Sequence, residues 1–306
     1  MRHLITLADL TTPQIERIFQ IARQLEDALD QGRRQPLLAG RVMALVFEKP
    51  SLRTRVSFEA GMAQLGGSSL ALGSEAGLGT RESLADFARV LSQYVDVIVA
   101  RTKRHDVVTN LARHAACPVI NGLTDYAHPC QALADLYTLR GWFGTFGSRP
   151  LAWIGDGNNV ARSLALGCGK LRLPMVMATP EPYQFDPSFL ETLRREVPQL
   201  ELTVTTDPGE AVRDAIAVYT DVWASMGQEA EAEKRRRAFG PYQVNAELMS
   251  RAPRDAVFMH CLPARRGEEV TDEVIDGPQS IVLRQAANRM HLQKGILVWI
   301  LNGEGP

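Results

Sequence analysis

The sequence predicts an α/β protein of two domains, each a parallel sheet flanked by helices. Short apolar runs recur along the 306 residues and alternate with segments in which apolar residues follow helical spacing. The runs are apolar throughout, as expected for strands that are covered on both faces. A glycine-rich segment at 141–150 interrupts this pattern and marks the expected boundary between the two domains.

The elements follow from these patterns in chain order. Leu10, Ile15 and Ile18 are spaced as on a helix, which we expect over residues 8–32. A second, buried helix is expected to begin near Ser51. Its apolar residues form two adjoining stripes, Leu52, Val56, Ala60 and Ala63 on one and Phe58, Met62 and Leu65 on the other. The predicted strands are Val42–Phe47, Val95–Val99, Pro118–Ile120, Leu151–Ile154, Met175–Ala178, Leu202–Val204, Ala215–Tyr219 and Val257–Met259.

The composition argues against several classes of protein. The 34 Lys and Arg residues balance 35 Asp and Glu residues, so no overall field favours nucleic acid or an anionic membrane. Cys117, Cys130, Cys168 and Cys261 form no C-x-x-C pair, which argues against a zinc module or a disulfide framework. No apolar run reaches the ~18 residues of a membrane span, and the N-terminus lacks a signal-peptide core. We expect a cytoplasmic protein that binds neither nucleic acid nor membrane.

Cations gather where the first predicted strand meets the helix near Ser51. Arg53, Thr54 and Arg55 fall in the first turn of that helix. Unpaired backbone N–H groups and the helix dipole favour an anion at this position. The two guanidiniums and two hydroxyls would bind phosphate through charge-assisted hydrogen bonds. A capped helix with solvated arginines is the alternative interpretation of the same residues.

Polar residues also follow other predicted strands, at the edge where open α/β sheets bind ligands. Arg101 comes just after an apolar strand, and His128 and Gln131 flank the first turn of a helix that begins at Pro129. A metal site at His128 and Cys130 is disfavoured because no second His/Cys pair lies near in the sequence. Polarisation of a carbonyl group suits His128 equally well.

The segment 155–159 follows a strand and invites interpretation as a dinucleotide-binding loop. Its fingerprint is incomplete, because Val160 stands where the third glycine is due, although Glu181 lies at the distance expected for a ribose-binding acid. The alternative is a tight turn that presents Asn158 and Asn159 to a polar ligand.

Two further strand ends carry reactive side chains. Asp221, near the segment 225–227, could hold an ammonium group or simply cap the chain locally. Cys261 is either a thiol at the ligand edge or a small buried apolar residue. The charged run Glu229–Arg237 is expected to be a solvated helix or a mobile loop.

In this order the motifs resemble the transcarbamylase family over nearly the whole chain. Residues 51–55 are similar to the family's carbamoyl-phosphate loop, and Asp221 with Ser225-Met226-Gly227 is similar to the site of the branch that uses ornithine. The other matching positions are Arg101, His128-Pro129-Cys130-Gln131, Asn158-Asn159, His260-Cys261-Leu262-Pro263 and Ala286-Ala287-Asn288-Arg289-Met290.

The resemblance implies transfer of a carbamoyl group from carbamoyl phosphate to the δ-amino group of L-ornithine, a step of arginine biosynthesis. No metal and no cofactor are implied, and the expected assembly is a homotrimer or a multiple of trimers. The implied domains are a carbamoyl-phosphate domain at 1–145 with a C-terminal helix at 286–306, and an ornithine domain at 146–285. The implied catalytic residues are Arg101, His128, Asp221 and Cys261. Those implied for carbamoyl phosphate are Ser51, Leu52, Arg53, Thr54, Arg101, His128, Gln131, Cys261, Leu262 and Arg289, and those for ornithine are Asn159, Asp221, Ser225 and Met226.

Two positions depart from the family pattern. Leu52 replaces the usual Thr, which is tolerable if this position contributes its backbone N–H. Gly77 stands where many relatives place Gln or His, so a contact with a neighbouring subunit must be missing or come from a residue such as Arg81. Three alternatives stay open from the sequence: a sister enzyme that uses N-acetylornithine or putrescine, a dinucleotide-dependent dehydrogenase, and an inactive protein that senses carbamoyl phosphate.

Overall fold

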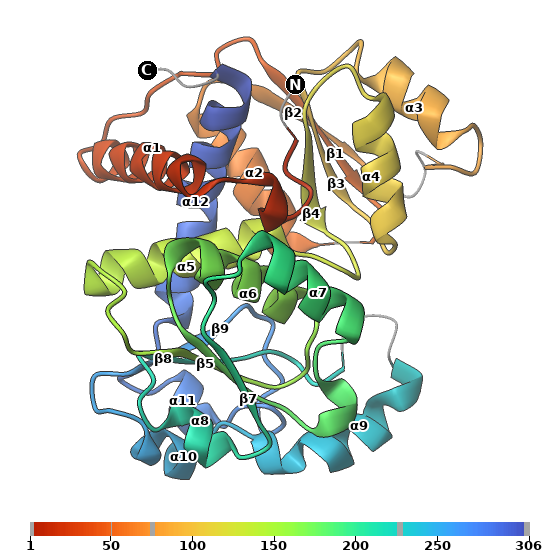
Figure 1. Cartoon of the computed structure of the whole chain (residues 1–306). Helices are drawn as coiled ribbons and strands as arrows, with labels where there is room; N and C mark the ends of the chain where they lie inside the picture. Colours follow the sequence, from red (N-terminus) through yellow and green to blue (C-terminus); the bar gives the residue numbers. More distant parts are fainter. Residues whose placement is uncertain (1–2, 50, 74–76, 225–228, 303–306) are drawn as a thin grey trace. The chain divides into compact units, whose positions relative to one another are not determined.

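The computed structural model describes residues 3–49, 51–73, 77–224 and 229–302 (Figure 1). The chain divides into two compact units, Met1–Tyr137 with Asn288–Pro306, and Thr138–Ala287, which we call unit 1 and unit 2. Within the described residues, unit 1 has a four-stranded sheet and unit 2 a five-stranded sheet, and all strand pairs in both are parallel. The predicted fold class is therefore confirmed.

The sheet of unit 1 has the strand order β2-β1-β3-β4. Ala44 and Val46 of β1 point to the same face as Ile98 and Ala100 of β3, where they pack against helices α3 and α4. Figure 1 shows α2 on the opposite face. The elements that lie wholly in unit 1 are η1 (Leu7–Asp9), α1 (Thr12–Asp30), β1 (Val42–Phe47), α2 (Leu52–Gln64), β2 (Ser68–Leu72), α3 (Leu84–Leu91), β3 (Val97–Arg101), α4 (His105–His114) and β4 (Val119–Leu123).

The sheet of unit 2 has the order β7-β6-β5-β8-β9. Ile154, Val218 and Phe258 belong to the core on the face that α8, α10 and α11 cover, and Figure 1 shows α6 and α7 on the other face. Helices α5 (Pro129–Phe143) and α12 (Val282–Asn302) each run from one unit into the other. The remaining elements are β5 (Leu151–Ile154), α6 (Asn159–Leu171), β6 (Met175–Ala178), η3 (Glu181–Tyr183), α7 (Pro187–Glu196), β7 (Leu202–Thr205), α8 (Pro208–Val212), β8 (Ala217–Thr220), η4 (Glu229–Glu231), α9 (Ala232–Phe239), η5 (Gly240–Tyr242), α10 (Ala246–Arg251), β9 (Val257–His260) and α11 (Asp272–Ile275).

All eight predicted strands are present, with ends that shift by up to three residues. The single helix expected over residues 8–32 is wrong at its start, because a short 3-10 turn precedes α1. Thr11 is extended between the two, and its hydroxyl accepts a hydrogen bond from the backbone N–H of Gln14, whose side chain accepts one from Thr11 N–H. This reciprocal cap starts a new helix.

The prediction for the apolar stripes of α2 was half wrong. Phe58 and Met62 are fully buried, as expected, but Leu52 is 76% exposed and Val56 50% exposed. Thr54 is buried instead. The helix thus turns its polar Thr54 inward, beside the core stripe, and leaves the other apolar stripe on the surface of the chain.

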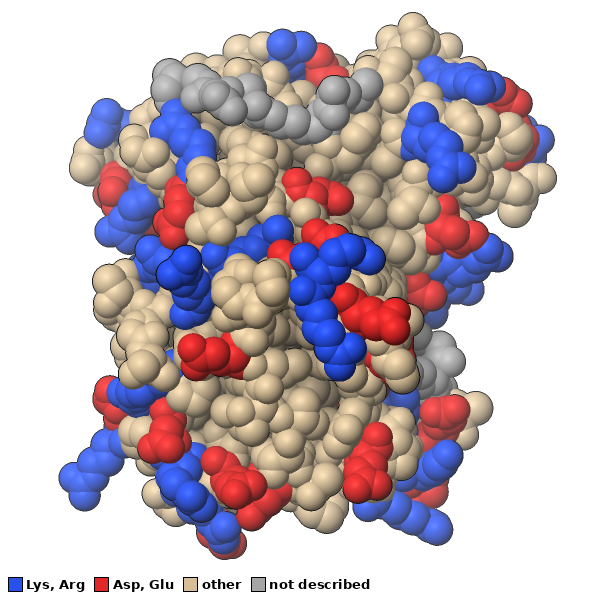
Figure 2. Space-filling model, in the orientation of Figure 1, with Lys and Arg blue, Asp and Glu red and all other residues tan. Residues whose placement is uncertain are grey.

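Charged side chains of both signs lie on the surface in view in Figure 2. Figure 2 shows acidic and basic side chains interspersed over this face, in keeping with the net charge of -1. In the part of the chain that the structure describes, each helix is too short or too polar to cross a lipid bilayer.

Candidate active site

Two guanidiniums of unit 1 converge on the hydroxyl of Thr54. Arg101, the last residue of β3, donates to this oxygen from Nη1 at 3.1 Å, and Arg289 of α12 donates from Nη2 at 3.0 Å. Thr54 is fully buried and Arg289 is only 4% exposed. A hydroxyl oxygen that accepts two bonds keeps its own hydrogen to donate. Two neighbouring cations and one available O–H make a favourable environment for an anion.

Gln131 extends the same cluster. Its Oε1 accepts a hydrogen bond from Nη1 of Arg289 at 2.8 Å, and its Nε2 donates to Asp135 at 2.8 Å. The two bonds use opposite ends of the amide and therefore set its orientation. One hydrogen-bond network thus connects residues 54, 101, 131 and 289, which lie far apart in the sequence.

His128 lies just before the first residue of α5 and is buried. Burial, followed by the positive charges of Arg289 and Arg101, holds the pKa of this imidazole well below its usual range. His128 is therefore neutral near pH 7. A neutral imidazole can donate a hydrogen bond to a carbonyl oxygen without adding a third cation to the cluster.

Ser51 occupies the N-cap position of α2 in an extended conformation. All residues of α2 are among those that the structure describes, and the Ser51 side chain makes no capping hydrogen bond to them. The capped-helix interpretation of the loop therefore loses its main support. Arg53 is half-buried, whereas Arg55 is exposed and pairs with Glu59 at 3.1 Å on the helix surface. Leu52 points its side chain outward, so its backbone N–H in the first turn is the group that remains for a ligand.

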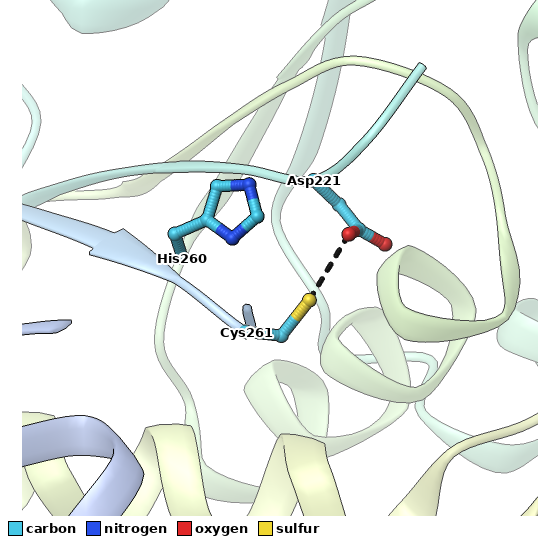
Figure 3. A group of neighbouring side chains, drawn as sticks. All are labelled: Asp221, His260 and Cys261. Carbon is cyan, nitrogen blue, oxygen red and sulfur yellow. Dashed lines mark hydrogen bonds between the residues drawn. The ribbon is translucent and has the colours of Figure 1, made fainter. Parts of the chain in front are cut away.

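In unit 2, Asp221 and Cys261 meet at the carboxyl ends of neighbouring strands (Figure 3). The thiol of Cys261 donates to Oδ1 of Asp221 at 3.0 Å, and Nδ2 of Asn158, from the loop after β5, donates to Oδ2 at 2.9 Å. Asp221 is 9% exposed. Three strand ends therefore hold one carboxylate in a fixed orientation, a suitable partner for an ammonium group.

His260 and Glu269 support the backbone beside Cys261. Nδ1 of His260 accepts a hydrogen bond from the N–H of Leu262 at 2.8 Å, so Nε2 carries the proton and donates to Glu269 at 3.2 Å. Both side chains are fully buried. Leu262 has a φ of 57°, a left-handed conformation that non-glycine residues adopt rarely and that these bonds help to maintain.

Asp221, His260 and Cys261 offer possible metal-ligand atoms that all lie within 4.8 Å of one another. Both ring nitrogens of His260 already make hydrogen bonds, and the Cys261 thiol is bonded to Asp221. A metal ion would have to displace one of these bonds to gain its imidazole ligand.

Of the other residues predicted to bind ornithine, the structure describes only Asn159. Asn159 is the first residue of α6, and its carbonyl oxygen accepts a bond from Ser163. Ser225 and Met226 lie outside the described residues. Sequence reasoning missed Glu269. It follows Glu268 directly, and two adjacent acidic residues are typical of an exposed segment.

The dinucleotide interpretation of the loop after β5 conflicts with the geometry. Oδ1 of Asn158 accepts hydrogen bonds from Val160 N and Ala161 N at 2.9 and 3.0 Å. These are the helix N-terminal N–H groups that would face a pyrophosphate in a dinucleotide site. The side chain at the start of α6 already satisfies them.

Two parallel sheets with polar residues at the carboxyl ends of their strands define an α/β enzyme for small polar substrates. The sequence profile described as "Aspartate/ornithine carbamoyltransferase, carbamoyl-P binding domain" matches residues 2–141, and that described as "Aspartate/ornithine carbamoyltransferase, Asp/Orn binding domain" matches residues 148–300. The chain belongs to the aspartate/ornithine carbamoyltransferase family, and the resemblance inferred from its motifs is confirmed.

Similar proteins cover the chain almost end to end. An ornithine carbamoyltransferase of Bacillus subtilis is 50% identical over 98% of this chain and 94% of its own length. One from Anoxybacillus flavithermus is 49% identical over 98% and 96%. Among solved structures, the ornithine carbamoyltransferase of Pyrococcus furiosus has a TM-score of 0.95 at 48% identity and covers 99% of this chain and 97% of that one. The enzyme from Thermus thermophilus has a TM-score of 0.88 at 42% identity over 98% and 99%.

Proposed function

We propose that the chain transfers the carbamoyl group of carbamoyl phosphate to the δ-amino group of L-ornithine and releases citrulline and phosphate. The observation that carries this proposal is the convergence of Arg101 and Arg289 on the Thr54 hydroxyl, in a chain nearly half identical to ornithine carbamoyltransferases. The relatives named above are ornithine carbamoyltransferases, and they favour neither a dehydrogenase nor a sister enzyme for another amine.

Phosphate binding is assigned to Ser51, Arg53, Thr54 and Arg101. The hydroxyl of Thr54 donates to a phosphate or carbonyl oxygen, because its acceptor sites are taken by the two arginines. Thr54, Arg101 and neutral His128 polarise the carbonyl oxygen as it gains negative charge in the tetrahedral intermediate.

The amide of the carbamoyl group needs acceptors for its N–H bonds and a fixed plane. The acceptor on one side is assigned to Oε1 of Gln131, which has a second lone pair for the amide and is oriented by the bond that Arg289 donates to it at 2.8 Å. The backbone carbonyls of Cys261 and Leu262 are assigned as acceptors, and Leu52 supplies its backbone N–H to the phosphate. Preorganised polar groups of this kind accelerate a reaction by positioning and by electrostatic stabilisation.

The attacking amine must lose a proton before it reacts. Its intrinsic pKa should resemble that of lysine, about 10.4, which leaves on the order of one molecule in a thousand neutral at pH 7. Asp221, hydrogen-bonded to the Cys261 thiol, is assigned to bind the ammonium form and arrange the loss of its proton. Asn159, Ser225 and Met226 are assigned to the α-amino and carboxylate groups of ornithine.

Assembly as a homotrimer or a multiple of trimers completes the proposal. Leu52 and Val56 of α2 and Leu70 of the edge strand β2 leave apolar surface exposed on unit 1, at 76%, 50% and 49%. An exposed apolar surface beside a sheet edge favours contact with a second copy. We assign carbamoyl phosphate to residues 1–145 with 286–306 and ornithine to 146–285, and we place the enzyme in the cytoplasm, where its four free thiols stay reduced.

Product formation tests the proposal directly. The purified chain is incubated with carbamoyl phosphate and, in parallel, L-ornithine, N-acetylornithine or putrescine, and the carbamoylated amine and phosphate are quantified. We expect citrulline and phosphate in equal amounts and far lower kcat/KM with the other two amines. Preferential turnover of either alternative amine would overturn the assignment of ornithine.

A further inference from the structure

Arg235 is a buried cation inside a run of charged residues. It lies on α9 and is 5% exposed, whereas the side chain of Arg237 on the same helix is 80% exposed. The expectation that Glu229–Arg237 forms a solvated helix or a mobile loop is therefore wrong at Arg235. Arginine is almost never this buried unless it is paired, so its partners indicate what it does.

Arg235 bonds to two loops of unit 2 and, from Nε at 3.4 Å, to Glu231 just before its own helix. Its Nη1 donates to Oδ2 of Asp156 at 2.6 Å and to the carbonyl oxygen of Trp223 at 2.9 Å. Its guanidinium also lies over the ring of Tyr183, 4.9 Å from the ring centroid. A planar guanidinium can make these contacts at once, whereas a lysine ammonium has neither the fork nor the flat face for stacking.

Both loops carry residues of the candidate amine site. Asp156 precedes Asn158 by two residues, and Trp223 follows Asp221 by two residues. The side chains of Asn158 and Asp221 are themselves joined at 2.9 Å. Arg235 therefore links the two loops whose side chains, Asn158 and Asp221, are hydrogen-bonded to each other.

We propose that Arg235 is a positioning residue that fixes Asp221 for the amine substrate by holding the 156 and 223 loops together. The proposal rests on the proposed function, because it assumes that Asp221 binds the amine of ornithine. Arg235 acts through Asp156 and Trp223 and not through contact with the substrate.

Electrostatics explain why this position needs a cation. Burial raises the pKa of Asp156, the bond to Arg235 opposes that rise, and the negative charge of Asp221 adds to it. Without Arg235, the Asp156 carboxylate would keep the unfavourable negative charge of Asp221, with only the weaker influence of Arg162 to oppose it. Asp156 would then take up a proton or move, and either change would release the loop that carries Asn158.

The test compares Arg235→Met, Arg235→Lys, Asp156→Asn and the double variant Asp156→Asn/Arg235→Met with the wild type. Arg237→Gln is the matched control, because its exposed side chain pairs only with Glu233 on the same helix among the described contacts. For each protein we measure the KM for ornithine, kcat, the dissociation constant of carbamoyl phosphate and the melting temperature. The double variant removes the unpaired carboxylate, so it should fold even if Arg235→Met does not.

We expect Arg235→Met to raise the KM for ornithine by about tenfold or more. This is the size of effect expected when charged hydrogen bonds that orient a ligand-binding group are lost. Arg235→Lys should show a smaller rise, and the double variant should be no worse than Arg235→Met, because both residues act through one pair. Carbamoyl-phosphate binding should stay within about twofold of wild type, and Arg237→Gln should match wild type throughout.

A lower melting temperature with an unchanged KM for ornithine in Arg235→Lys and the double variant would show that Arg235 only stabilises the fold. Equal losses in ornithine use and carbamoyl-phosphate binding would also overturn the proposal. If the wild type itself forms no citrulline, the proposed function fails and this role of Arg235 fails with it. The wild-type measurement therefore separates the two failures.

Discussion

Replacing Thr54 by Val would remove the oxygen on which Arg101 and Arg289 converge while nearly keeping the volume of the side chain. Arg289 is 4% exposed, so its Nη2 would lose a buried acceptor, which costs about 1–3 kcal/mol of unfolding free energy. Arg101 is partly exposed, and water can replace its bond at lower cost. Loss of the O–H donor to phosphate should weaken the binding of carbamoyl phosphate by roughly 1.5–3 kcal/mol, which raises its dissociation constant about 10- to 150-fold.

Calorimetric titration with carbamoyl phosphate and denaturant unfolding of the free enzyme measure the two effects separately. Thr54→Ser is the control, because it keeps the hydroxyl and loses only a methyl group. It should retain most of the binding that Thr54→Val loses. If both variants bind carbamoyl phosphate like the wild type, or if both lose binding equally, the hydroxyl does not organise the two arginines and the reasoning fails.

Three further predictions concern single side chains. Asp221→Asn should lower kcat/KM for ornithine by about 10²-fold or more in steady-state assays and leave carbamoyl-phosphate binding nearly unchanged, because only the amine needs the carboxylate. The lowered pKa of His128 means that below about pH 6.5 the unfolded chain takes up a proton that the folded chain resists, so stability falls with falling pH by up to about 1.4 kcal/mol per unit. Urea unfolding of His128→Asn between pH 6.5 and 5 should show a shallower loss than the wild type; equal slopes would contradict the assignment. Gly295→Ala would place a Cβ 2.7 Å from the carbonyl oxygen of Ile18 and should cost about 1–3 kcal/mol in thermal unfolding, whereas Gly141→Ala, with nothing within 4 Å, should not destabilise the protein.

The strands could be predicted because a strand covered on both faces leaves a continuous apolar run in the sequence. Val42–Phe47, Leu151–Ile154 and Met175–Ala178 match their predicted ends. Strand β2 was missed for the same physical reason. It lies at the edge of its sheet, its residues Ser68–Leu72 are half-buried or exposed, and two serines begin it, so no apolar run marks it.

The candidate site was predictable where a side chain directly follows a strand or starts a helix. Arg101, His128 and Asp221 could be singled out from that position alone, although their roles came from the family resemblance. The connection between Thr54 and Arg289 could not be predicted from spacing, because 235 residues separate them and only the packing of α12 in unit 1 brings them together. Local patterns indicate which residues are available at strand ends, whereas long-range packing decides which of them meet.

The predictions for Arg235 and for the stripe of Leu52 and Val56 were wrong in opposite directions and for one reason. Arg235 was expected to be exposed and is buried, whereas Leu52 and Val56 were expected to be buried and are exposed. Both interpretations assumed that polarity decides which face of a helix is buried, so a charged run was expected in solvent and an apolar stripe in the core. The largely buried carboxylate of Asp156, on the loop after β5, makes an inward arginine on α9 favourable. On α2, Thr54 holds the inward position, where its oxygen accepts hydrogen bonds from two guanidiniums. A polar residue turns inward where a polar partner lies within hydrogen-bonding distance, and in α2 the apolar residues Leu52 and Val56 are left exposed. In this chain both inversions occur beside candidate site residues, so departures of a helix from its apolar pattern are themselves a signal of where the site lies.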